Sequence, residues 1–80
     1  MSTKKYNLTA TIWEEDGVYV SKCPELGVAS CGDKPEEALS NLKEAVELYL
    51  DNAKELGLIE EIDTVLISPH KFILTFEVTA

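Results

Sequence analysis

The side chains of this 80-residue sequence that could take part in catalysis or metal binding are two cysteines, one histidine and a short acidic run. Seven residues lie between Cys23 and Cys31, and His70 is far along the chain. A zinc site shows closely spaced ligand pairs, and a catalytic cysteine needs a base in an electropositive pocket. The sequence therefore predicts no catalytic residue, no metal site and no cofactor, with His70 in an exposed turn. A disulfide between the cysteines stays open, on condition of an oxidising compartment or a hyperthermophilic source.

The acidic run is Glu14, Glu15 and Asp16, at the tip of an expected hairpin. Carboxylate oxygens suit a hard cation, but the spacing matches no EF-hand, and a hairpin tip is a natural solvated site. A second set of acids recurs at three and four residues, where like charges repel by a few tenths of a kcal/mol. Both sets fit either a solvated surface or contact with a basic partner. The second set is Glu44, Glu47, Asp51 and Glu55.

The charge balance restricts the partners. The chain has 15 acidic and 7 basic residues, a formal net charge of -8 and no arginine. Binding to nucleic acid or to anionic membranes requires a basic surface, so neither is expected. The charge favours a basic protein partner, or serves solubility alone. No signal peptide and no apolar run of about 20 residues is present, which predicts a cytoplasmic protein with reduced thiols.

The elements that position these residues follow from apolar periodicity. Alternation predicts strands, a three-and-four spacing predicts a helix, and Asp16-Gly17 and Pro24 mark turns. The expected strands are residues 6–13, 18–23, 28–31 and 71–79, and the expected helix is residues 35–56. Gly57 suits the position after the helix. Residues 58–70 fit a helix, a strand or an extended crossover.

The order βββαβ predicts one α+β domain over residues 1–80. The first three strands form an antiparallel meander, and a right-handed crossover places the final strand beside the first and parallel to it. The single helix covers one face of the sheet. The open face, which carries Trp13, favours a homodimer or a higher homo-oligomer.

Four motifs in this order resemble the HicB antitoxin family and its stand-alone UPF0150-type relatives. They are Asp16-Gly17, Cys23-Pro24-Glu25-Leu26, Gly32-Asp33 and Glu36-Glu37-Ala38-Leu39. Lys34 departs from the family, which often has a hydroxyl residue at the helix cap. The resemblance implies a partial ribonuclease H-like fold.

The resemblance also implies a function. HicB proteins bind HicA, a small basic RNA-cleaving toxin, and cover its active site. Many carry a C-terminal DNA-binding domain, which is not expected here, so direct DNA binding is not expected either. The residues expected to contact the partner are Glu14, Glu15, Asp16, Pro24, Glu25 and Leu26.

Two other functions compete with the antitoxin role. A ribonuclease H-type nuclease needs several carboxylates converging on two metal ions. The expected first strand, residues 6–13, contains no acid, so we expect no enzymatic activity. A stand-alone binding or structural module with an unknown partner fits the sequence as well as an antitoxin does.

Overall fold

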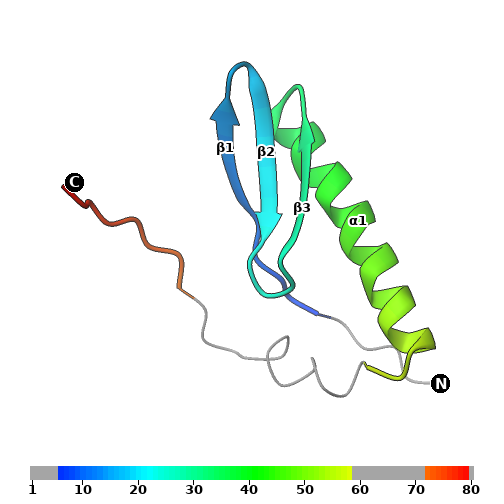
Figure 1. Cartoon of the computed structure of the whole chain (residues 1–80). Coiled ribbons are helices and arrows are strands. Elements are labelled where there is room, and N and C mark those ends of the chain that lie inside the picture. The colour runs from blue at the N-terminus through cyan, green and yellow to red at the C-terminus, as the bar shows by residue number, and fades with distance from the viewer. Residues whose placement is uncertain (1–5, 59–71, 80) are drawn as a thin grey trace.

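The structure is a computed structural model that describes residues 6–58 and 72–79. Within this part, the elements are β1 (Thr11–Glu15), β2 (Val18–Cys23), β3 (Val28–Gly32) and α1 (Pro35–Glu55) (Figure 1). The strands form an antiparallel sheet in the order β1-β2-β3. Helix α1 packs on one face, chiefly against β3 and β2. The predicted α+β class, with a meander followed by one helix, is confirmed.

The turn between β1 and β2 is the two-residue hairpin that the sequence predicts. Glu15 pairs with Val18 across it. Asp16 and Gly17 have φ angles of 50° and 82°. Both lie in the left-handed region, as a type I′ turn requires, and Asp and Gly are among the residues that tolerate it best.

The turn between β2 and β3 begins at Pro24. Proline has no N–H to continue the ladder, so β2 ends at Cys23, as predicted. The carbonyl of Cys23 instead accepts hydrogen bonds from the N–H groups of Leu26 (3.3 Å) and Gly27 (2.8 Å). Gly27 has a φ of 70°, which reverses the chain into β3.

The first strand differs from the prediction at both ends. It begins at Thr11, which pairs with Lys22, and it continues to Glu15. The ladder cannot extend far before Thr11, because β2 stops at Cys23. The prediction that this strand carries no acid was therefore also wrong. Glu14 and Glu15 both lie within it, and as neighbours in a strand they point to opposite faces of the sheet.

The start of α1 is stabilised without a capping side chain. Pro35 occupies the first turn, as predicted, and Lys34 stands at the N-cap in an extended conformation with no side-chain cap. The Glu37 carboxylate reaches back to accept a hydrogen bond from the N–H of Asp33 at 3.2 Å. Glu37 thus satisfies a backbone donor just before the helix with its own side chain.

The end of α1 is a Schellman motif, in agreement with the prediction for Gly57. The N–H of Gly57 bonds to the carbonyl of Lys54 (3.1 Å), and the N–H of Leu58 bonds to that of Ala53 (2.8 Å). Gly57 has a φ of 72°. This pattern satisfies the last carbonyls of the helix.

The core lies between α1 and the sheet. Cys23, Leu42 and Val46 form its buried centre, with further apolar side chains packed around them. Gly32 lets the helix approach, since a Cβ there would lie 2.7 Å from the backbone nitrogen of Ala38. No helix in the described residues is long and apolar enough to cross a membrane.

The predicted final strand is not observed. Residues 72–79 form no strand, are exposed, and lead away from the sheet (Figure 1). The described residues therefore do not show the predicted fourth strand parallel to the first. A strand needs a neighbour to accept its hydrogen bonds, and none of the described strands lies beside them. His70 and nearly all of the ambiguous segment 58–70 fall outside the described residues.

Candidate functional site

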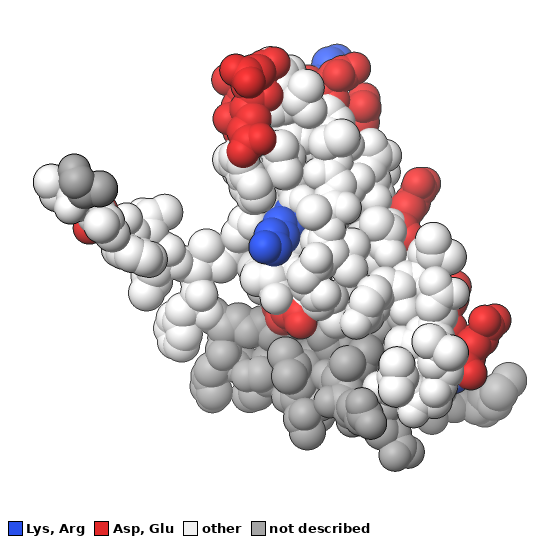
Figure 2. Space-filling model, in the orientation of Figure 1, with Lys and Arg blue, Asp and Glu red and all other residues white. Residues whose placement is uncertain are grey.

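The tip of the β1–β2 hairpin is an exposed acidic surface. Glu14, Glu15 and Asp16 are all exposed there, and Figure 2 shows acidic side chains gathered at this tip and along the helix. Glu14 pairs with Tyr19 and Glu15 with Val18, so their side chains leave the hairpin on different faces. Residues 6–58 and 72–79 contain no group of three His, Cys, Asp or Glu side chains close enough to hold a metal ion.

An apolar row lies next to this acidic tip on the open face of the sheet. Trp13 pairs with Val20, and Val20 pairs with Cys31 on the next strand. The indole Nε1 of Trp13 donates a 2.9 Å hydrogen bond to Glu15. Trp13 is 39% exposed. The hairpin therefore presents a large aromatic side chain beside a fixed carboxylate, a combination suited to protein contacts.

The second predicted group of contact residues serves the fold as well. Both oxygens of the Glu25 carboxylate accept from the N–H of Thr9, at 3.1 and 3.2 Å. The thiol of Cys23 lies 3.5 Å from the same carboxylate. Leu26 packs against the core cluster, whereas Pro24 is exposed. Of the three, Pro24 is the side chain most accessible to a partner.

The six predicted residues do not form one site. Glu14, Glu15 and Asp16 lie close to Val18, the first residue of β2. Pro24 directly follows Cys23, its last residue. Figure 1 shows the two turns at opposite ends of the sheet. A partner that touches both would have to span the length of the hairpin.

The two cysteines lie on opposite faces of the sheet. Cys23 shares a face with Ser21, which pairs with Ser30; Cys31 follows Ser30 and so points the other way. Cys23 is 1% exposed, and its burial raises the pKa of the thiol from the ordinary value of 9.0. Cys31 is exposed, and both are free. A disulfide between them within one chain is excluded.

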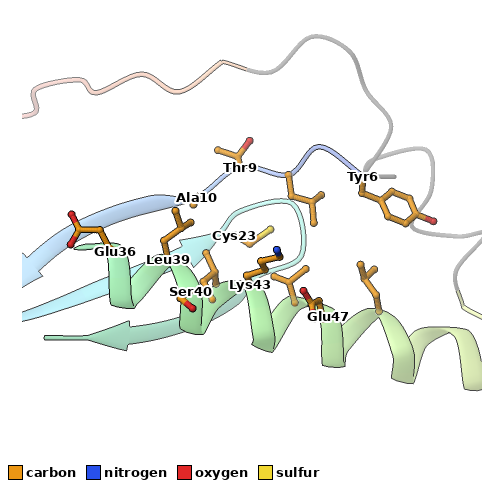
Figure 3. A pocket seen from close by; sticks show the side chains of 13 residues that line it. Tyr6, Thr9, Ala10, Cys23, Glu36, Leu39, Ser40, Lys43 and Glu47 are labelled. Atoms are coloured by element: carbon orange, nitrogen blue, oxygen red, sulfur yellow. The ribbon is translucent and has the colours of Figure 1, made fainter. Parts of the chain in front are cut away.

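An open groove lies between α1 and the extended chain before β1, and none of the predicted motifs indicated it. It has a volume of ≈ 670 Å³. Figure 3 shows its two walls, with Thr9 and Ala10 on the chain and Leu39, Lys43 and Glu47 on the helix. The sequence signal that could have found it is the width of the apolar stripe along residues 35–56, which includes Leu39. The helix packs toward β3, so Leu39 is left 48% exposed.

Comparison with known proteins places the chain in a family. A family model described as a family of unknown function, DUF7387, matches residues 2–72. The chain is 47% identical over 49 residues to UPF0150 protein ssr1765 of Synechocystis, covering 59% of this chain and 62% of that protein. It is 39% identical over 62 residues to a UPF0150 protein of Helicobacter pylori, covering 74% of this chain and 86% of the relative. No solved structure matches significantly. The chain belongs to the UPF0150 family, and its sequence fits the DUF7387 family model.

Proposed function

We propose that this protein is a non-enzymatic antitoxin of the HicB type, which binds a small basic RNA-cleaving toxin of the HicA type and covers its active site. Membership of the UPF0150 family supports this, because the sequence motifs link that family to HicB proteins. The observation that carries the proposal is the acidic hairpin tip, where Glu14 and Glu15 end β1 and Asp16 begins the turn, all three of them exposed.

In this proposal the acidic hairpin acts by electrostatic attraction to the toxin. A toxin that binds RNA needs a cationic surface, and this chain has a net charge of -8. Opposite charges steer the two proteins together and raise the association rate. Exposed ion pairs contribute little to affinity, about 0–1 kcal/mol each. The acids therefore act mainly on the encounter, and apolar contacts must keep the complex together.

Trp13 is the side chain best placed to provide such contacts. It is a large aromatic residue next to the acidic tip, and its indole is oriented by Glu15. Interfaces draw most of their energy from a few buried aromatic and arginine residues. Pro24 remains a contact residue in this proposal, at the far end of the hairpin. Leu26 and Glu25 contribute by shaping the turn that presents it.

A nuclease role receives less support. Metal-dependent cleavage needs carboxylates that converge on two ions. The acids of β1, Glu14 and Glu15, lie on opposite faces of the sheet, so they do not point to a common centre. The competing role as a binding module for another partner is favoured by one observation, the apolar groove beside α1.

The proposal is tested by the binding kinetics of the full chain with a HicA-type toxin encoded beside its gene. Surface plasmon resonance across a salt series should give an association rate that falls as salt rises, because salt screens the attraction. A dissociation rate that changes little over the same series is expected. Absence of binding would overturn the antitoxin role and leave the module with another partner.

A further inference from the structure

Residues 72–79 have the composition of a strand but no strand beside them. Phe72, Leu74, Phe76 and Val78 alternate with Ile73, Thr75 and Glu77, and the exposed fractions of the first four range from 72 to 87%. Phenylalanine, valine and threonine favour strands. A contiguous exposed apolar row of this kind marks an interaction surface. The segment is thus ready to pair with a strand edge that has a free side.

Strand β1 provides such an edge. It is the first strand of the sheet order β1-β2-β3, so among the described strands it has a neighbour on one side only. At the other edge, β3 carries the main packing of α1. An extended segment added to β1 would satisfy its outward backbone groups.

The groove lies along the same side of the domain. Leu8 and Ala10, on the chain that leads into β1, form one wall, and Leu39, Val46 and Leu50 of α1 line the other. A strand placed at the β1 edge directs every second side chain toward the helix side of the sheet. The apolar row of residues 72–79 has the spacing to supply those side chains. One such segment can therefore pair with the β1 edge and fill the groove at the same time.

We infer that residues 72–79 of one copy add as a strand to the β1 edge of a second copy, and that the exchange is reciprocal. Phe72 and Ile73 line a small cavity of ≈ 290 Å³ with Thr9, Pro24 and Glu25. Beyond them the segment leads away from its own β1 (Figure 1). It is therefore directed outward, toward a neighbouring molecule. A two-fold exchange covers both apolar segments and both free edges at once.

The charge distribution allows this contact. Glu77 is the only titratable side chain in residues 72–79, so docking the segment brings one further carboxylate to the β1 edge of the second copy. Each copy still carries a net charge of -8. The two copies repel one another at long range, and added salt should strengthen the dimer by screening. Toxin binding has the opposite salt dependence, so failure of one proposal is distinguishable from failure of the other.

Sedimentation equilibrium on the full chain tests the exchange. The wild-type protein should be a dimer at tens of micromolar, and Phe76→Asp should weaken dimerisation at least tenfold. Thr75→Asp is the matched control, since it adds the same charge on the opposite side of the segment, and it should weaken dimerisation less. Phe76 is 87% exposed in the single chain, so its replacement leaves the fold intact. A monomeric wild type, or a Phe76→Asp variant that dimerises like the wild type, would overturn the inference.

A second measurement establishes which copy donates the strand. Isotope-filtered nuclear Overhauser spectra are recorded on a mixture of labelled and unlabelled chains. The inference predicts contacts between the ring protons of Phe76 in unlabelled copies and the amides of Ala10 and Ile12 in labelled copies. Contacts that occur only within one copy would show that the segment folds back on its own β1, which contradicts the exchange.

Discussion

The hydroxyl of Ser21 donates a 2.8 Å hydrogen bond to the main-chain carbonyl of Ala38, and both residues are 0% exposed. Ser21 lies in the middle of β2, and Ala38 lies in the first turns of α1. The bond fixes the helix over the central strand at the point where Gly32 allows the closest approach. This contact adds a specific polar link to the apolar packing between α1 and the sheet.

Removing this bond should destabilise the domain. Ser21→Ala is expected to lower the free energy of unfolding by about 1 kcal/mol, the net worth of a typical buried hydrogen bond. Urea denaturation measures the change. Ser40→Ala serves as the control, because Ser40 is exposed on α1 and surface changes stay within about 0.5 kcal/mol. Equal urea midpoints for Ser21→Ala and the wild type would show that the bond contributes nothing.

Glu25 should hold the chain before β1 in place. Glu25→Ala removes the acceptor of the Thr9 N–H and should cost roughly 1–2 kcal/mol, below the full range for charged hydrogen bonds because Glu25 is only half-buried. Hydrogen exchange should show faster exchange of the Thr9 amide. Glu25→Gln keeps a neutral acceptor and should lose less. An unchanged exchange rate at Thr9 in Glu25→Ala would contradict this role.

Local features of the fold could be predicted from the sequence, and contacts between distant residues could not. Asp16-Gly17, Pro24 and Gly57 each dictate a backbone conformation through their own chemistry, and all three occupy the expected turns or ends. The start of β1 depends instead on where β2 stops. The bond from Thr9 to Glu25 joins residues 16 apart in the chain, and no local pattern reveals it.

In the candidate site, too, local features could be predicted from the sequence and contacts between distant residues could not. The exposure of the hairpin acids could be predicted, because a two-residue turn has no room to bury them. The hydrogen bonds of Glu25 within the domain and the packing of Leu26 could not be predicted. The Pro-Glu-Leu motif is the same whether its side chains face a partner or the core. The strand pattern of residues 72–79 and the order of the elements predict pairing beside the first strand, but they do not identify which copy of the chain provides that strand.

Stability should fall at high pH through Cys23. Burial raises the pKa of this thiol, so the folded state keeps its proton while the unfolded state loses it near the ordinary value of 9.0. The contribution is complete below that value and is lost as pH rises through the folded pKa. Urea unfolding at pH 8 and pH 10 should show a smaller loss for Cys23→Ala than for the wild type. Cys31→Ala, at the exposed cysteine, should lose as much as the wild type, and a smaller loss there would assign the effect to the wrong thiol.

Charge at the hairpin tip should control the association rate with the toxin. In the first variant, Glu14→Lys and Glu15→Lys are combined with Asp16→Asn, since asparagine tolerates the left-handed backbone of the turn. Association should slow by roughly tenfold or more, within the range that electrostatic steering provides. Surface plasmon resonance gives the rates.

A matched variant tests whether the position of the changed charge matters, or only its amount. Glu44→Lys and Glu55→Lys with Asp51→Asn remove the same negative charge from exposed positions on α1. This variant should associate at nearly the wild-type rate if the partner meets the hairpin. An equal slowing in both variants would mean that net charge alone matters, and that the hairpin is no contact surface.

Inhibition of RNA cleavage tests the antitoxin role most directly. A fixed amount of the HicA-type toxin is titrated with the full chain, and cleavage of RNA is followed on a gel. We expect cleavage to stop at about one antitoxin chain per toxin, and the hairpin variant to require a higher concentration. A complex that forms while cleavage continues undiminished would contradict neutralisation.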